Sequence, residues 1–221
     1  MRANNTMIGW LQAAPLAIIL GGFLVIPIIM IVVVSFWGAT EWSIYPAFQF
    51  DNYEFLFSSW VTYSVFLKTF KYALVTWALT LLIGFTVAYF LAFHVRKLPW
   101  QIALFLLCTV PFWTSNIIRM ISWIPFLGRN GIANSTLISW GVIDEPIEWL
   151  LFSDFAVILA FVHLYTLFMV VPIFNTMMRI EKSLIEAARD AGANGAQILW
   201  NVIIPLTKPG IMIGTIFVIT L

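Results

Sequence analysis

Charged residues are scarce in this sequence. Only 10% of its 221 residues are Asp, Glu, Lys or Arg, whereas 62% are hydrophobic and 17% are aromatic. A soluble domain of this length keeps much of its surface in water, and so few charges could not cover that surface. The scarcity therefore disfavours a soluble enzyme and a nucleic-acid-binding domain with a basic stripe, and it indicates a polytopic membrane protein.

Residue types that carry chemistry are scarce as well. Cys108 is the only cysteine, which disfavours a disulfide scaffold, and the two histidines lie far apart in the sequence. The sequence has no Gly-rich loop that ends in Gly-Lys, no zinc-site spacing and no nucleophilic triad. We therefore expect a non-catalytic chain with no metal site and no cofactor of its own, and any ATP would be held by another chain.

Four uncharged runs are long enough, at about 20 residues each, to cross a bilayer as helices. A fifth run begins at Pro209 and reaches the end of the sequence after about a dozen residues, roughly half of what a crossing needs. We expect an all-α protein whose intact form completes this fifth span and adds a sixth. The expected spans are 14–36, 72–93, 100–118, 155–175 and the incomplete 209–221.

Basic residues are unevenly distributed between the connecting segments. The side that holds the N-terminus carries 7 of the 11 Lys and Arg residues, and the other side carries 7 of the 10 acids. Because short cytoplasmic segments are enriched in Lys and Arg, we expect a cytoplasmic N-terminus.

Small residues recur in the second expected span. Gly84, Ala88 and Ala92 are spaced four apart, which places them on one helical face that a neighbouring helix can approach closely. We interpret this face as a packing surface.

Polar and aromatic residues gather at the end of the third expected span, between Pro111 and Arg119. Polar groups at lipid depth usually face the bundle interior, so Trp113, Asn116 and Arg119 are candidates for a substrate pathway. His163, the only ionisable residue of the fourth span, is a further candidate. The structural alternatives are that Arg119 reaches the outer interface, Asn116 bonds a neighbouring helix, and His163 is a neutral helix contact.

The connection from residue 180 to 209 is long enough to need structure of its own. Ser183 followed by Glu186 matches a capping box and predicts a helix over 184–191. Gly192 is placed to end this helix in the left-handed conformation.

A second helix is expected directly afterwards. Asn194 followed by Gln197 repeats the capping pattern and predicts a helix from 195 to about 203, which Pro205 would end. On the first helix a small apolar face is suited to a groove on a soluble partner, and it consists of Leu184, Ala187, Ala188 and Ala191.

This segment resembles the EAA loop of bacterial binding-protein-dependent ABC importers. That loop reads E-A-A, three residues, G, nine residues, I, one residue, L-P, and here the matching positions are Glu186-Ala187-Ala188, Gly192 and Val202-Ile203-Ile204-Pro205. The two departures, Val202 for Ile and Ile204 for Leu, are conservative. The stretches 70–92, 111–119, 141–147 and 184–206 are also similar to permease subunits of the spermidine/putrescine type.

The resemblance implies a single transmembrane permease domain over 1–221 with the type I importer fold, in which the segment 180–205 couples to an ATPase. It implies ABC ATPase subunits that hold ATP and Mg, an extracytoplasmic substrate-binding protein, and a second permease subunit, with a heterodimer favoured. It places the protein in the bacterial inner membrane, in contact with lipid and not with nucleic acid. The implied coupling residues are Glu186, Ala187, Ala188, Gly192 and Pro205.

The substrate is less constrained than the class of protein. Acidic residues on the outer side suit a polyamine, and Trp113 could contact a cation through its ring. Arg119 suits an anion instead, so another organic cation, an opine, an iron chelate or a sulfate/molybdate-like anion remains an alternative. An ion-driven secondary transporter is more remote because it needs charged relay groups within the spans, and a membrane enzyme would need a catalytic cluster. The acids in question are Asp144, Glu145, Glu148 and Asp154.

Overall fold

The computed structural model describes residues 2–221, with side chains from residue 11 onward. Apart from one two-residue strand pair, the regular elements of this part of the chain are helical, and four of the helices are long and apolar enough to cross a membrane. A bent helix pair passes the same test if it counts as one span. The expected class, an all-α polytopic membrane protein, is confirmed. The chain divides into two compact units, one up to Phe66 and one over Leu67–Leu221.

The first unit holds a long apolar helix and a small aromatic cluster. Helix α1 (Arg2–Val34) covers the first expected span as far as Val34, and its window Leu11–Val34 has no buried residues, as a lipid-facing helix should. Strands β1 (Gly38–Ala39) and β2 (Ile44–Tyr45) pair antiparallel, and helix α2 (Asp51–Ser58) follows. The Asn52 amide donates to the carbonyl oxygens of Ser35 and Trp37, at 2.9 and 3.0 Å, which ties α2 to the end of α1.

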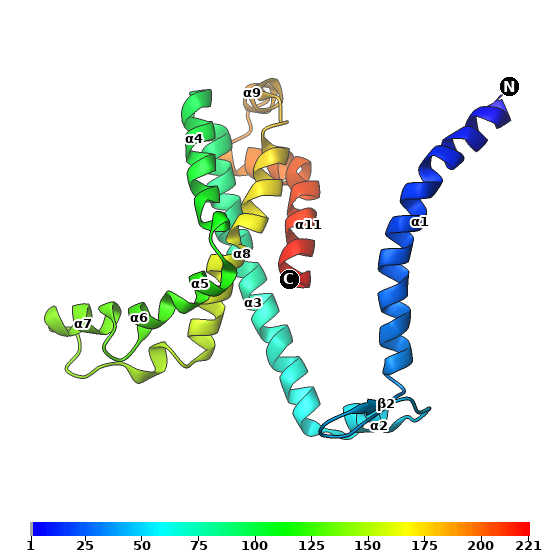
Figure 1. Ribbon diagram of the computed structural model, residues 1–221. Coiled ribbons are helices and arrows are strands. Elements are labelled where there is room, and N and C mark those ends of the chain that lie inside the picture. Colours follow the sequence, from blue (N-terminus) through cyan, green and yellow to red (C-terminus); the bar gives the residue numbers. More distant parts are fainter. Residues whose placement is uncertain (1) are drawn as a thin grey trace. The chain divides into compact units, whose positions relative to one another are not determined.

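The second unit is built around three long helices (Figure 1). Helix α3 begins in the first unit and extends through a π-helical turn, η1, while α8 and α11 carry the later expected spans. The elements of the second unit are α3 (Trp60–Tyr89), η1 (Phe90–His94), α4 (Leu98–Thr109), η2 (Val110–Trp113), α5 (Asn116–Ile121), α6 (Trp123–Leu127), α7 (Ile132–Ser139), η3 (Glu148–Leu150), α8 (Asp154–Met177), α9 (Lys182–Asp190), α10 (Gly195–Ile198), η4 (Leu199–Ile203) and α11 (Ile204–Thr220).

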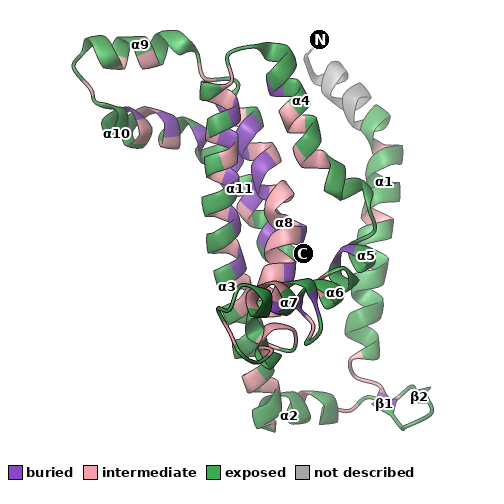
Figure 2. Cartoon of the chain, turned by 90° about the vertical axis from the view of Figure 1, so that its left-hand side faces the viewer, coloured by how far each residue is buried: buried purple, intermediate pink, exposed green. Residues whose placement is uncertain are grey.

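The core of this unit lies where α3 and α11 meet α8, and the buried positions in Figure 2 follow these contacts. A Cβ atom on Gly84 would lie 2.8 Å from Met169 Cγ, and one on Gly214 would lie 2.6 Å from Met169 Sδ. Ala88 is fully buried in the same cluster. The expected close packing along Gly84 and Ala88 is therefore confirmed, and Gly214 of α11 approaches the same methionine of α8 just as closely.

The third expected span differs from the sequence interpretation. The helix ends at Trp113, five residues before Ile118, and the segment from Asn116 to Ser139 is turned by 91° from it. Pro111 removes one helical N–H within the 3-10 turn η2, and Thr114 and Ser115 then take extended ψ angles of 150° and 138°. Asn116 and Arg119 consequently belong to a separate short helix, α5.

We expect Gly210→Ala to loosen the packing of α11 on α8. The added Cβ would lie 2.5 Å from the Pro172 carbonyl oxygen, and this backbone atom cannot move aside cheaply. Overpacking of this kind costs about 1–3 kcal/mol, so the thermal unfolding midpoint in detergent should fall. Gly21→Ala on α1 is the matched control, because nothing lies within 4 Å of its Cβ. An unchanged midpoint for Gly210→Ala would contradict the close approach.

Candidate functional site

The first half of the segment 180–205 is helix α9, and its N-terminus differs from the expectation. Glu181 is the N-cap residue, with φ −67° and ψ 134°, so the helix begins at Lys182 and Ser183 lies in its first turn. The Ser183 hydroxyl bonds the Glu181 carboxylate at 3.2 Å instead of a backbone N–H. The predicted Ser183–Glu186 capping box is therefore wrong, because an extended residue two positions earlier already starts the helix.

The turn after α9 forms as predicted. Gly192 has φ +86°, in the left-handed region, and its N–H donates to Arg189 O at 2.9 Å while Ala193 N–H donates to Ala188 O at 3.0 Å. This pair of bonds is the Schellman motif that ends many helices. The second capping box is also confirmed, since Asn194 and Gln197 exchange bonds of 2.8 and 2.9 Å.

Pro205 does not end the second helix, which corrects the expectation. The chain stays helical from Gly195 to Thr220, passing through α10, the π turn η4 and α11. The π turn, closed by Ile204 N–H on Leu199 O, shifts the hydrogen-bond register just before the proline. Pro205 then lies in the first turn of α11, where its missing N–H is tolerated. In Figure 2 the segment that begins with α10 runs across the view and then bends into the vertical α11.

Helix α9 has one face on the bundle and one face exposed. Ile185 and Ala188 pack against the core cluster. Leu184, Ala187 and Ala191 are exposed and follow one another at spacings of three and four residues, so they share one side of the helix, next to the packed Ala188. The apolar face expected from the sequence thus remains uncovered over three of its four residues.

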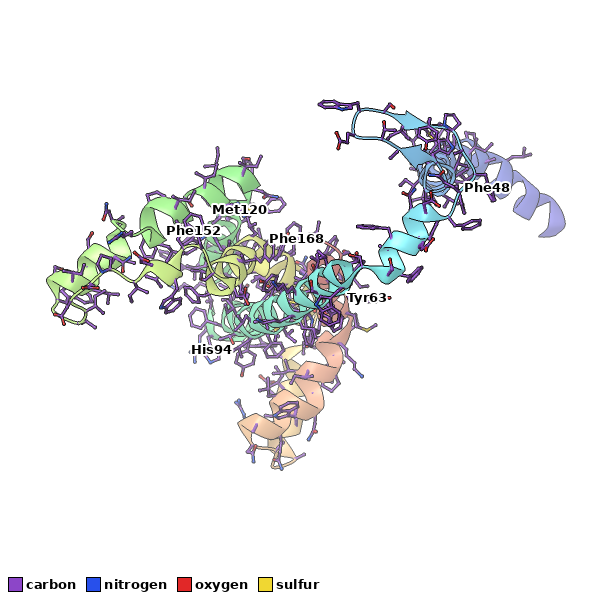
Figure 3. All side chains as sticks on the ribbon, turned by 90° about the horizontal axis from the view of Figure 1, so that it is seen from below. Phe48, Tyr63, His94, Met120, Phe152 and Phe168 are labelled. Atoms are coloured by element: carbon purple, nitrogen blue, oxygen red, sulfur yellow. The ribbon has the colours of Figure 1, made fainter. Side chains whose placement is uncertain are left out.

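A cavity of about 440 Å³ lies between α9 and the end of α3. Glu186 faces it together with basic groups from both elements. The lining residues that carry polar side chains are Tyr89, His94, Arg96, Lys182, Glu186 and Arg189. His94 lies at the edge of the bundle in the view of Figure 3.

Gln101 holds the π turn beside this cavity and was missed by the sequence reasoning. Its side chain, only 6% exposed, donates to Leu91 O at 2.8 Å and lies 3.4 Å from Ala92 O. These carbonyls belong to the last turn of the second span and would otherwise lack a partner in an apolar setting. An amide at the start of the otherwise apolar stretch 100–108 was the available signal.

A second cavity, of about 550 Å³, lies between α3, α4, α5, α6 and α8, and we call it the Arg119 cavity. The Arg119 side chain is 7% exposed and donates to Asn116 Oδ1 on the same helix. His163 Nδ1 accepts a bond of 3.2 Å from Trp123 Nε1. The cavity is lined by Ile83, Val87, Cys108, Pro111, Phe112, Arg119, Trp123, Leu159, Val162, His163, Thr166, Leu167 and Val170.

The four candidate pathway residues are only partly brought together. Arg119 and His163 line the same cavity, and Asn116 joins it through its bond to Arg119. Trp113 is 87% exposed and is not among the lining residues. Arg119 is buried and bonds Asn116 within its own helix, and in the described residues Asn116 has no recorded bond to a neighbouring helix, as its structural alternative required. His163 does make a helix contact, through Trp123.

Two of the acids expected to face solutes are already paired. Asp154 at the start of α8 accepts from Lys71 Nζ at 2.7 Å and from Tyr72 Oη at 2.5 Å, which joins α8 to α3. Glu148 pairs with Arg129 at 3.3 Å.

Fully buried Asn134 holds the loop before η3, because it donates to Gly128 O and Ile147 O and accepts from Ile147 N–H.

Aromatic contacts connect the cavity region to α11. The Phe168 ring of α8 lies within the bundle (Figure 3), 5.3 Å from the Phe112 ring and 5.9 Å from the Phe217 ring, between centroids.

The arrangement of helices matches solved transporters. Two crystal structures of a bacterial alginate ABC transporter, one of them in complex with an alginate pentasaccharide-bound periplasmic protein, superpose with TM-scores of 0.66. The chain shares 20% and 22% identity with them, and the match covers 99% of this chain and 74% and 75% of theirs. The fold is therefore that of an ABC transporter permease.

Sequence comparison defines the family. The chain is 36% identical over 216 residues to the spermidine/putrescine transport system permease protein PotB of Escherichia coli K12, covering 96% of this chain and 73% of that protein. It is 35% identical to PotB of Haemophilus influenzae, over 89% of this chain and 68% of that protein, and 26% identical to the inner membrane ABC transporter permease protein YdcU of E. coli, over 81% and 60%. The chain belongs to the family of spermidine/putrescine transport system permease proteins. No protein-family model matches it.

We expect Gln101→Leu to destabilise the end of the second span. The substitution keeps the side-chain volume but leaves buried carbonyls of η1 without a donor, at a cost of about 1–3 kcal/mol. The thermal unfolding midpoint in detergent should fall, and protease sensitivity near Val95 should rise. Gln12→Leu, at an exposed position on α1, should change neither measurement. Equal behaviour of the two variants would show that the Gln101 bonds contribute nothing.

Proposed function

We propose that this chain is the membrane-spanning subunit of an ATP-driven importer that moves a small polyamine, such as spermidine or putrescine, into the cytoplasm. The family supports the substrate class, because its named members are spermidine/putrescine permeases. The observation that carries the coupling role is helix α9, which is seated on the bundle by one face and uncovered on the other.

The proposed partners supply what this chain lacks. An ABC ATPase would hold ATP and Mg, a second permease subunit would complete the pore as a heterodimer, and an extracytoplasmic binding protein would deliver the substrate. The basic residues beside α9 support a cytoplasmic location for this segment and for the N-terminus, in a bacterial inner membrane. The permease itself would bind no cofactor.

The contacts of α9 suggest how movement of the ATPase would reach the membrane helices. The exposed face of Leu184, Ala187 and Ala191 would lie in a groove of the ATPase, and Glu186 and Ala188 would fix the helix between that groove and the bundle. Gly192 turns the chain directly into α10. Because α10, η4 and α11 form one helix through Pro205, a displacement of α9 would be transmitted into a membrane helix.

The transmitted movement would reach the substrate pathway through α8. Gly210 and Gly214 place α11 against α8, and α8 carries His163 into the Arg119 cavity. We assign Arg119, His163 and Asn116 to the pathway region, with exposed Trp113 at its outer end. Asp144 and Glu145 remain available to an incoming amine, since Glu148 and Asp154 are paired within the chain.

Gly192→Asp tests the coupling role. We expect it to reduce substrate-stimulated ATP hydrolysis of the reconstituted complex at least tenfold and to weaken ATPase retention on the purified permease. Gly141→Asp is the matched control, because Gly141 also has a positive φ, +68° against +86°, and neither glycine has an atom within 4 Å of its Cβ. Both variants therefore carry the same backbone strain, about 1–2 kcal/mol. Equal ATPase activity of complexes with Gly192→Asp and Gly141→Asp would contradict the coupling role.

Uptake by proteoliposomes tests the substrate. Vesicles that contain the permeases, the ATPase and the binding protein should accumulate labelled spermidine or putrescine only with internal ATP and with the ATPase present. Uptake that persists without the ATPase would identify an ion-driven transporter instead. A binding protein with affinity for neither polyamine would remove them as substrates.

A further inference from the structure

The Arg119 cavity contains a buried cation that the chain itself does not neutralise. Arg119 is 7% exposed, one of its terminal nitrogens donates to Asn116, and its Nε has no partner among the residues that the structure describes. An amide oxygen is neutral, so it satisfies a donor without balancing the charge.

The other polar groups of the cavity do not balance the charge either. None of the described lining residues is acidic. His163 Nδ1 already accepts from Trp123, so the neutral imidazole presents an N–H donor on its other nitrogen. The Thr166 hydroxyl donates to Val162 O at 2.5 Å. The two ion pairs recorded in the described residues join Lys71 to Asp154 and Arg129 to Glu148, at exposed positions outside the cavity.

A buried charge without a counter-charge is strongly unfavourable, whereas a buried pair with complete hydrogen bonds is tolerated. The acceptor must be present in the resting transporter, because Arg119 is charged whether or not substrate is bound. A polyamine cannot serve, since it carries charge of the same sign. The acceptor is therefore a permanent part of the assembly.

The rim of the cavity fits a protein partner. Ile83 and Phe112 line it and are 40% and 48% exposed, so apolar surface surrounds the buried guanidinium. An arginine beside an apolar rim, with an N–H that has no partner within its own chain, is typical of the dry centre of a protein interface.

We propose that the Arg119 cavity receives an Asp or Glu side chain of the second permease subunit, which pairs with Arg119. The proposal rests on the proposed function in so far as that function requires a two-permease pore. It assigns Arg119 a role in assembly, in addition to its place beside the pathway.

The proposed pairing predicts that one substitution stabilises the single permease and weakens its association with the second permease. We expect Arg119→Met to raise the thermal unfolding midpoint of the purified single permease, because it removes an unpaired buried charge. The same variant should weaken association with the second permease about a hundredfold, measured by energy transfer between labelled subunits in nanodiscs. Arg129→Met is the matched control, because Arg129 is exposed and pairs within the chain, and it should change association less than about twofold.

A charge swap covers the case in which Arg119→Met does not fold. Arg119→Glu should prevent association with the native partner, and replacing one acid of the partner by Arg should restore it. Restoration by none of the partner's acids would overturn the proposal.

The remaining outcomes distinguish a failure of the Arg119 pairing from a failure of the proposed polyamine import. Unchanged association of Arg119→Met, with a raised KM for uptake, would assign the cavity to substrate and overturn the pairing. Unchanged association and unchanged uptake would assign the acceptor to water or lipid, and would overturn it too. ATP-dependent polyamine uptake by the wild-type complex is measured separately, so its absence would contradict the proposed function while the association measurement still decides the pairing.

Discussion

The close approach of α3 and α11 to Met169 of α8 is the contact on which the second unit depends. Within a bilayer, burying apolar side chains against one another gains little over lipid, so close packing and hydrogen bonds must hold the helices together. Gly84 and Gly214 provide that packing, since a Cβ on either would overlap Met169. The position of α8 then determines where His163 lies relative to Arg119, and the position of α11 determines where α10 and α9 are mounted.

Backbone polar groups impose the second constraint, because the bilayer offers no water to satisfy them. Both π turns lie where the membrane helices meet the coupling segment, and each has a nearby side chain that bonds its carbonyls. Gln101 does so for η1, and Thr207 does so for η4 by donating to Ile203 O at 2.8 Å. The irregular turns can therefore remain in an apolar setting, and η4 lets one helix carry Pro205 without a break.

Local patterns were predicted well where the interaction closes within a few residues. The left-handed Gly192 and the Asn194–Gln197 capping box depend only on their own turn, and both are present. The Ser183–Glu186 box was wrong because Glu181 competes for the same helix start. The helix stop at Pro205 and the end of the third span at residue 118 were wrong because a π turn and an extended Thr114–Ser115 pair are choices of backbone conformation that residue type alone does not reveal. Gln101 and Asn134 were missed because their partners lie elsewhere in the chain.

The sequence by itself determined the solvent, the helical class and the family, because the scarcity of charge, the length of the apolar runs and the EAA spacing are properties of the linear chain. It also pointed to Arg119 and His163. Only the tertiary structure decided that these two residues line one cavity, that Trp113 does not, and that Asp154 and Glu148 are already paired. The physical reason is that burial and charge pairing depend on which helices are neighbours, and the neighbours of α8 are set by small residues far apart in the sequence.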